Sequence, residues 1–377
     1  MKILHIADLH IGKVVNGYSM IAEQTHALEQ IVSYTNEHKP QCILIAGDVY
    51  DKPIPSVESI QTFDNFLTDL VATNTTIFIV AGNHDSPERL GFASRLLANQ
   101  RIHLCGSFNG SIPCVTLADD HGNINFWLLP YIKPLSVRHF YENEKDHIHT
   151  FEDAAKVVFA NANVDFSTRN VLISHQYYKK DGQDALRSDS EQDPIGGLDG
   201  IDISHIQHFD YVALGHLHRP QSAGFAHIRY CGSPVKYSLS EHNHKKSVSL
   251  VTIAKKGDVQ IQTLDITPLN DMQHIQGTLE ELIALPQSNN YTYITLTNEE
   301  ELVDPHGKLR VTFPNLMNIE FKNSRTNATI NYTSIEEKAN LSTFELFSQF
   351  FLDRNGSVMT AEQEQIIQEL LTEEVSA

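Results

Sequence analysis

The sequence predicts an α/β protein with its functional site at the carboxyl ends of parallel strands. Short apolar runs of strand-like composition alternate with amphipathic stretches of helical period, which favours a sheet covered by helices. Asp, His or Asn residues follow five of these runs, and ligands bind outside the carboxyl ends of strands in open α/β sheets. The five runs are 3–6, 42–46, 76–80, 171–173 and 211–214.

The polar residues that follow these runs predict a metal centre. Their donors are carboxylate, amide oxygen and imidazole, a set that suits manganese, iron or zinc and disfavours a cysteine-type structural zinc site. Seven candidates are too many for one tetrahedral ion, so we expect two ions, which about 3.5–4 Å apart can clamp a phosphate during in-line displacement. The seven predicted ligands are Asp8, His10, Asp48, Asn83, His175, His216 and His218.

We expect Asp48 to bridge the two ions. Taken singly, an Asp or His at a strand end is more often a helix cap or a solvated loop residue than a metal ligand. The pairs Asp8–His10 and His216–His218, however, each place two side chains on one face of an extended chain, which favours a shared site. One ion would take Asp8, His10, Asp48 and His218, and the other would take Asp48, Asn83, His175 and His216.

Two further residues in the Gly-Asn-His-Asp motif are predicted to be catalytic. His84 follows a predicted ligand, and a histidine titrates near neutral pH, so it can protonate a leaving oxygen. Asp85 either orients His84 or caps the helix that follows. The helix cap is at least as good an explanation of Asp85 as the orientation of His84.

Several helices and one hairpin are expected along the first two thirds of the chain. Apolar residues at helical spacing and flanking prolines mark the helices, and Lys256-Gly257-Asp258 marks the hairpin turn. The stretch 181–202 is a polar loop that either recognises the substrate or is disordered, and Lys245-Lys246 forms a small basic patch for phosphate. The expected helices are 21–37, 56–70, 87–97 and 146–164, and the hairpin strands are 248–253 and 259–264.

Three regions are expected: a catalytic domain at 1–266, a small α+β domain at 267–322, and a linker with two helices at 323–377. In the second region, 279–285 is a helix and 291–297 and 318–321 are strands. Both terminal helices begin with capping boxes, Ser342–Glu345 and Thr360–Gln363. Their apolar faces favour docking, either back on the small domain or on a partner.

The composition and net charge restrict the class of protein to which this chain can belong. The 377 residues are 41% hydrophobic and 20% charged, as in ordinary globular proteins, and no apolar run is long enough for a transmembrane helix. No signal peptide is expected, and four cysteines without C-x-x-C spacing favour the cytoplasm. The net charge of −19 opposes DNA binding by the isolated chain, because DNA-binding domains usually carry a basic surface. Metal ions and a basic partner would supply positive charge.

The motifs Asp-Leu-His, Gly-Asp-Val-Tyr-Asp, Gly-Asn-His-Asp, Ser-His and Gly-His-Leu-His resemble, in this order, those of the calcineurin-like metallophosphoesterases. The later block Tyr230-Cys231-Gly232-Ser233-Pro234 resembles the DNA-repair nuclease branch of that family. The resemblance implies a four-layer α/β-β/α sandwich with a small α+β capping domain and C-terminal helices. It also implies two Mn²⁺ ions, proton donation by His84, a homodimer, and a coiled-coil ATPase partner.

The function implied is therefore metal-dependent cleavage of DNA ends and hairpins. No P-loop motif is present, so ATP dependence would come from the partner. A phosphatase or nucleotide phosphodiesterase for small substrates is the enzymatic alternative, and a scaffold that has lost its metals is the non-enzymatic one. The intact set of seven ligand types argues against the scaffold.

Overall fold

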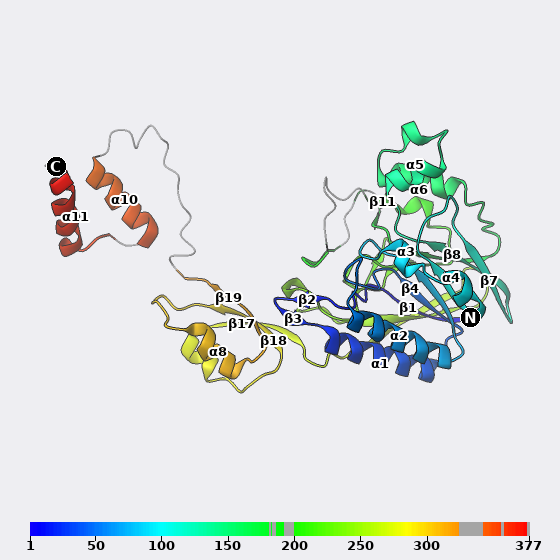
Figure 1. Ribbon diagram of the computed structural model, residues 1–377, viewed down its shortest axis with the longest axis horizontal. Helices are drawn as coiled ribbons and strands as arrows, with labels where there is room; N and C mark the ends of the chain where they lie inside the picture. Colours follow the sequence, from blue (N-terminus) through cyan, green and yellow to red (C-terminus); the bar gives the residue numbers. More distant parts are fainter. Residues whose placement is uncertain (181, 183–185, 192–199, 324–341, 356–357, 375–377) are drawn as a thin grey trace. The chain divides into compact units, whose positions relative to one another are not determined.

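The computed structural model describes residues 1–180, 182, 186–191, 200–323, 342–355 and 358–374. The chain divides into two compact units, Met1–Met272 and Gln273–Ala377 (Figure 1). Within the described ranges, no helix has both the length and the apolar character needed to cross a membrane. The expected loop 181–202 is described only in part.

The first six-stranded sheet has a parallel centre. It contains β1 (Lys2–Ile6), β4 (Cys42–Ala46), β5 (Thr76–Val80), β6 (Ile102–Cys105), β15 (Ser247–Ile253) and β16 (Val259–Asp265), in the order β16-β15-β1-β4-β5-β6. β1, β4, β5 and β6 run parallel, and the predicted hairpin β15–β16 joins antiparallel to β1. β4 and β5 are buried along their whole length, as in sheets covered on both faces.

The second six-stranded sheet has a similar plan. It contains β7 (Cys114–Asp119), β8 (Gly122–Leu129), β9 (Arg169–Ser174), β12 (Tyr211–Leu214), β13 (Gln221–Ala223) and β14 (Phe225–Tyr230), in the order β13-β14-β12-β9-β8-β7. The four central strands are parallel, and β13 and β7 are antiparallel edges. Because the central strands of each sheet are parallel, their carboxyl ends lie along the same edge, as the sequence predicts.

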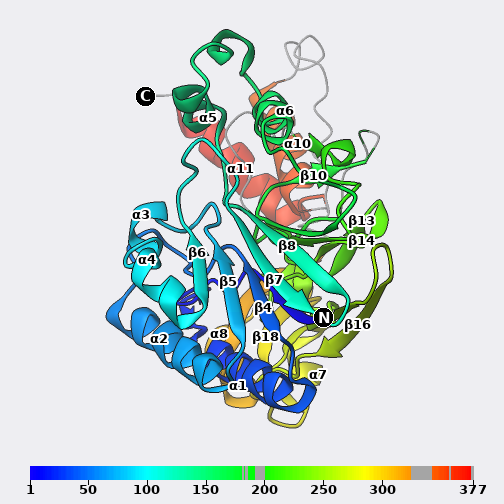
Figure 2. The ribbon, with the colours of Figure 1, turned by 90° about the vertical axis from the view of Figure 1, so that its right-hand side faces the viewer.

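The two sheets face each other and carry helices on their outer faces. Phe78 of β5 stacks on Phe126 of β8 with ring centroids 4.5 Å apart. Figures 1 and 2 show α1 (Ile21–His38) and α2 (Val57–Ala72) side by side along the first sheet. Ala154 and Val158 of α6 (Phe151–Ala160) share a buried cluster with Leu172 of β9, near α5 (Pro134–Phe140). The four-layer α/β-β/α sandwich is confirmed.

Two expected helices differ from the structure. The stretch 87–97 is not one helix but two short ones, α3 (Pro87–Leu90) and α4 (Ser94–Leu97), because Ala93 has a left-handed φ of 59° between them. The helix expected at 146–164 begins only at Phe151, because Thr150 and Asp153 form a capping box there. Short elements complete this unit: β2 (Val14–Val15), β3 (Tyr18–Ser19), β10 (Tyr178–Lys179), β11 (Ile201–Asp202), and 3₁₀ turns at Ala98–Gln100, Lys145–His147, Ile203–His205 and Leu239–Glu241.

The second unit contains a three-stranded sheet. Its strands β17 (Met272–Gly277), β18 (Tyr291–Leu296) and β19 (Leu316–Phe321) are adjacent in that order. Leu282 of α7 (Leu279–Ile283) and Leu309 of α8 (Pro305–Thr312) share a buried cluster with Ile294. The sequence predicts α7, β18 and β19 but misses β17, whose residues are mostly polar, and α8, which contains Gly307.

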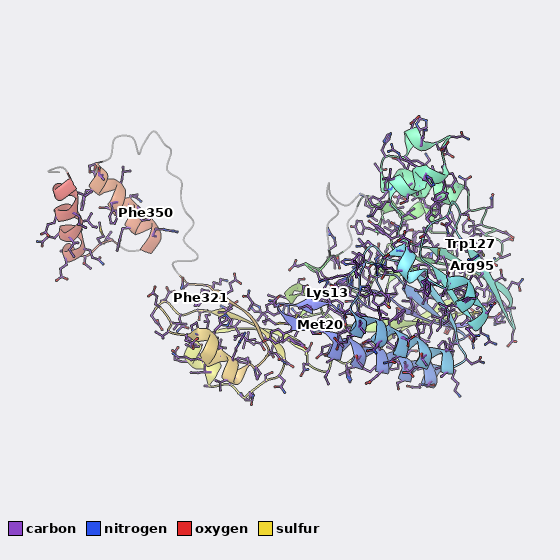
Figure 3. The ribbon with its side chains drawn as sticks, in the orientation of Figure 1. Lys13, Met20, Arg95, Trp127, Phe321 and Phe350 are labelled. Carbon is purple, nitrogen blue, oxygen red and sulfur yellow. The ribbon has the colours of Figure 1, made fainter. Side chains whose placement is uncertain are left out.

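Two helices, α10 (Thr343–Asn355) and α11 (Ala361–Glu374), follow in the described part of the chain. Both predicted capping boxes are present: the Ser342 N–H donates to Glu345 (2.7 Å) and the Thr360 N–H donates to Gln363 (2.9 Å). Phe350 of α10 is 56% exposed (Figure 3). The linker expected at 323–340 lies, apart from Asn323, outside the described residues.

Candidate metal centre

The structure brings all seven predicted ligands to one place between the two sheets. They follow the carboxyl ends of β1, β4, β5, β9 and β12, which supports the reasoning from strand ends. Asp8, His10, Asp48 and His216 also have left-handed φ angles of 54°, 43°, 50° and 91°. Such residues cost about 1–3 kcal/mol each and cluster at functional sites.

One group of donors contains Asp8, His10 and His218. His10 Nε2 lies 3.0 Å from His218 Nε2 and 3.6 Å from Asp48 Oδ2. Asp8 Oδ1 accepts the backbone N–H of His216 at 2.8 Å, whereas Asp8 Oδ2 is buried with no hydrogen-bond partner. Because an orphaned buried carboxylate oxygen is costly, this atom fits a role as a cation ligand.

A second group contains Asn83, His175 and His216. Asn83 Oδ1 lies 3.0 Å from both His175 Nε2 and His216 Nδ1. His175 Nδ1 donates to the carbonyl of Ala46 at 2.7 Å, which fixes its ring and turns Nε2 toward the site. Asp48 Oδ2 is 3.2 Å from His175 Nε2, so this carboxylate lies between the two groups.

The charges of the site fit a bound cation. Burial raises the pKa of Asp8 well above its usual range and lowers the pKa of His216 to about 3, so His216 is neutral, as a metal ligand must be. Burial disfavours the charged forms of Asp48 and His175, but the two side chains stabilise each other's charge. The pKa of Asp48 is therefore held well below its usual range, and that of His175 is raised to about 9. A cation on His175 Nε2 would replace that proton.

His84 lies at the half-buried rim of the site. Its backbone N–H donates to Asp48 Oδ1 at 2.8 Å, and its ring Nδ1 donates to the Asp51 carbonyl at 2.9 Å. Its ring meets that of His10 edge-on at 4.7 Å between centroids. Sequence reasoning assigned no function to Asp51, yet its carboxylate also pairs with Lys13 (2.7 Å; labelled in Figure 3).

Asp85 makes neither of the two expected contacts. Its buried carboxylate accepts the backbone N–H groups of Gly82 (2.9 Å), Val49 (3.2 Å) and Tyr50 (3.0 Å). The cap of α3 is Ser86, whose hydroxyl accepts from the Arg89 N–H, and His84 is oriented by Asp51 instead. Asp85 therefore ties the loop after β4 to the loop after β5.

Glycines allow the loops to approach one another closely. A Cβ on Gly215 would lie 2.0 Å from the Ala46 carbonyl oxygen and 2.7 Å from His175 Nδ1. We expect Gly215→Ala to destabilise the fold by about 1–3 kcal/mol, because overpacking moves backbone. It should also weaken the binding of divalent metal ions, because the displaced Ala46 carbonyl accepts the Nδ1–H that orients His175. Thermal melting and Mn²⁺ titration would measure both effects.

A matched control is Gly17→Ala. Gly17 has a φ of +86° but no atom within 4 Å of its Cβ position. This substitution should cost only the backbone strain of about 1–2 kcal/mol and leave Mn²⁺ affinity unchanged. Equal Mn²⁺ affinity in the two variants would contradict the role given to Gly215.

Lys246 does not belong to a basic surface patch. It is 5% exposed, and its ammonium group donates to Glu241, to Ser233 Oγ (2.8 Å) and to the His218 carbonyl (2.9 Å). Burial alone would raise the pKa of Glu241, but the neighbouring Lys246 and His218 hold it well below its usual range. The doublet Lys245-Lys246 suggests solvent exposure, so sequence patterns could not reveal this buried pair.

Gln24 and Tyr237 also support the site and were missed by the sequence reasoning. Gln24 donates to the carbonyl of His10 at 2.7 Å and accepts from the Gly12 N–H at 3.0 Å. Tyr237 is buried, and its ring meets those of His10 and His218 edge-on. A glutamine on a predicted helix and a tyrosine in a loop give no local signal for such roles.

Comparison with known proteins agrees with this geometry. Residues 1–220 match the family described as Calcineurin-like phosphoesterase, and residues 268–355 match the Type 5 capsule protein repressor C-terminal domain. The chain is 30% identical over 349 residues to the D subunit of the nuclease SbcCD of Staphylococcus epidermidis. That alignment covers 90% of this chain and 89% of the relative.

Two solved structures are also similar. A dimetal phosphatase from Danio rerio has a TM-score of 0.42 and 15% identity, covering 71% of this chain and 99% of that one. The protein TT1561 of Thermus thermophilus has a TM-score of 0.39 and 11% identity, covering 70% and 98%. On the family matches and the long alignment, this chain belongs to the SbcD family of calcineurin-like metallophosphoesterases, and it is a phosphoester hydrolase.

Proposed function

We propose that this chain is a two-metal DNA nuclease, acting in DNA repair, recombination and replication as the SbcD component of an ATP-dependent SbcCD complex. The main support for a two-metal site is the convergence of seven carboxylate, amide and imidazole donors. This donor set suits Mn²⁺, which is the ion we favour. When bound, two ions would neutralise phosphate charge and activate a water for in-line attack.

We assign metal binding and proton donation to different side chains of the site. Asp8, His10 and His218 would hold one ion, and Asn83, His175 and His216 would hold the other, with Asp48 available to both groups. His84 donates its Nδ1–H to the Asp51 carbonyl, and in its doubly protonated form its Nε2–H would deliver a proton to the departing oxygen and leave the neutral Nδ1–H imidazole. Asp85 orders the backbone and takes no part in proton transfer.

DNA is favoured over small phosphate esters because of the relative named as a nuclease, which aligns along nearly the whole chain. We expect exonuclease activity on double-stranded ends and endonuclease activity on hairpins and single strands. The test is Mn²⁺-dependent cleavage of a blunt duplex and of a hairpin, with and without an SbcC ATPase. Rapid hydrolysis of p-nitrophenyl phosphate esters with both DNAs left intact would instead support a small-substrate phosphatase or nucleotide phosphodiesterase.

The partner proposed for the terminal helices is the coiled-coil base of an SbcC-type ATPase. Within the described side chains, apolar residues of α10 and α11 are exposed, including Phe347 (36%), Ile366 (56%) and Leu370 (55%). The region 323–377 would dock there, and 267–322 would cap the substrate. Such a partner would also supply positive charge, because this chain carries −19. We place the complex in the cytoplasm at the nucleoid, consistent with four cysteines that form no disulfide.

A homodimer within the heterotetramer is also proposed, through an apolar patch on α2 and the 91–97 segment. Val57 is 75% exposed, Phe92 80% and Leu96 71%. Exposed apolar patches of this kind mark association surfaces. The double variant Val57→Glu/Phe92→Glu should be monomeric, because it puts charges into the buried contact. Light scattering after gel filtration measures the mass.

Leu135→Glu is the matched control for this prediction. Leu135 is also 75% exposed, but it lies on α5, outside the patch. This control should remain dimeric. A dimeric double variant would contradict the proposed interface, and a monomeric wild type would contradict the dimer itself.

A further inference from the structure

Buried groups from two separate segments hold His218. Its backbone N–H donates to Glu191 Oε1 at 2.7 Å, and its carbonyl accepts from Lys246 Nζ at 2.9 Å. Its ring Nδ1 lies 2.7 Å from Ser190 Oγ. The backbone and the ring of this predicted ligand are thus fixed at the same time.

The hydrogen bonds determine which ring nitrogen of His218 carries the proton. Ser190 has one hydroxyl proton, and it donates this proton to Glu241 Oε1 at 2.5 Å. Its oxygen must therefore accept from His218 Nδ1–H. The lone pair of His218 is then on Nε2, the atom that lies 3.0 Å from His10 Nε2 in the metal centre.

Glu241 is held in place as an ionised acceptor. Its side chain is fully buried, and its second oxygen accepts from the buried Lys246 ammonium. The three N–H groups of Lys246 are satisfied by Glu241, Ser233 and the His218 carbonyl. A buried ion pair contributes little to stability on average. The Lys246–Glu241 pair also contacts His218, so we assign it a function in positioning that residue.

Ser190 belongs to a segment that is tied to the same part of the fold. The Leu186 N–H donates to Gln221 Oε1 at 3.1 Å, and Gln221 Nε2 donates to the Leu186 carbonyl at 2.7 Å. The Asp189 N–H donates to Ser240 Oγ at 2.9 Å. The hydroxyl of Ser190 is therefore delivered to His218 by backbone contacts on both β13 and the turn that carries Glu241.

We propose that Ser190 and Glu241 are positioning residues for the ion held by Asp8, His10 and His218. Together they fix His218 in the Nδ1–H form and aim Nε2 at that ion. Outer contacts of this kind orient metal-bound histidines, and their loss weakens metal affinity about 10- to 100-fold. The inference rests on the metal centre of the proposed function.

The test is Mn²⁺ binding to the full chain, measured by titration calorimetry and by the electron paramagnetic resonance of free Mn²⁺. Wild type should bind two ions. Ser190→Ala should weaken one of them about 10- to 100-fold and leave the other unchanged. Ser190→Thr keeps the hydroxyl and should restore the affinity. Ser222→Ala, an exposed serine on β13, is the matched control and should bind as wild type.

The outcomes separate this inference from the proposed function. Two wild-type affinities in Ser190→Ala would overturn the positioning role and leave the metal centre intact. A wild type that binds no Mn²⁺ would overturn the metal centre and this inference with it. Melting of the metal-free variants controls for folding, since a purely structural serine would lower the melting temperature without selecting one ion.

Discussion

His84→Ala should lower Mn²⁺-dependent DNA cleavage by about 10²- to 10⁴-fold, the usual contribution of a general acid. The ring lies at the rim of the metal centre and donates to the Asp51 carbonyl, so its loss removes a proton donor but no predicted ligand. Two Mn²⁺ ions should still bind with wild-type affinity. Single-turnover cleavage and Mn²⁺ titration measure the two effects separately.

The control for this variant is His121→Ala. His121 is exposed in the turn between β7 and β8, and its removal should change neither quantity. If His84→Ala lost an ion as well as activity, His84 would be a ligand rather than a proton donor. The grouping of His84 with His10 and Asp48 makes this alternative concrete.

Asp48→Asn should abolish high-affinity binding of both ions and lower cleavage at least about 1000-fold, because the metals supply several kcal/mol of transition-state stabilisation. Asp48 Oδ2 lies 3.6 Å from His10 Nε2 and 3.2 Å from His175 Nε2, so it serves both groups. The amide can still accept the His84 N–H, so the loop should remain folded. Calorimetry and cleavage assays check the result.

Asp64→Asn is the control for the change in charge. Asp64 is exposed on α2, and its amide should leave metal binding intact. Loss of only one ion in Asp48→Asn would contradict a shared carboxylate. It would also show which of the two groups depends on Asp48.

The strands that form the site could be predicted from the sequence because they are both apolar and buried. β4, β5 and β12 begin and end where the apolar runs do. These three buried strands contain no Asp, Asn or His, so the first such residue lies just beyond the end of each strand. The ligand candidates could therefore be found from local patterns alone.

The remaining features depend on contacts between distant segments. The helix expected at 87–97 has good helical composition, yet the left-handed Ala93 breaks it. Asp85 and Lys246 have surface-like neighbours in the sequence, but the fold buries both beside the metal centre. Local patterns report exposure on average, and they cannot identify a charged side chain that finds its partner only after folding.

The seven predicted ligands are proposed to hold two ions. The most direct measurement is a crystal structure of the full chain grown with Mn²⁺, with anomalous difference density collected at the manganese edge. We expect two peaks about 3.5–4 Å apart. One peak should contact His10 and His218, the other His175 and His216, and both Asp48. A single peak, or peaks that leave Asp48 without a metal contact, would contradict the account.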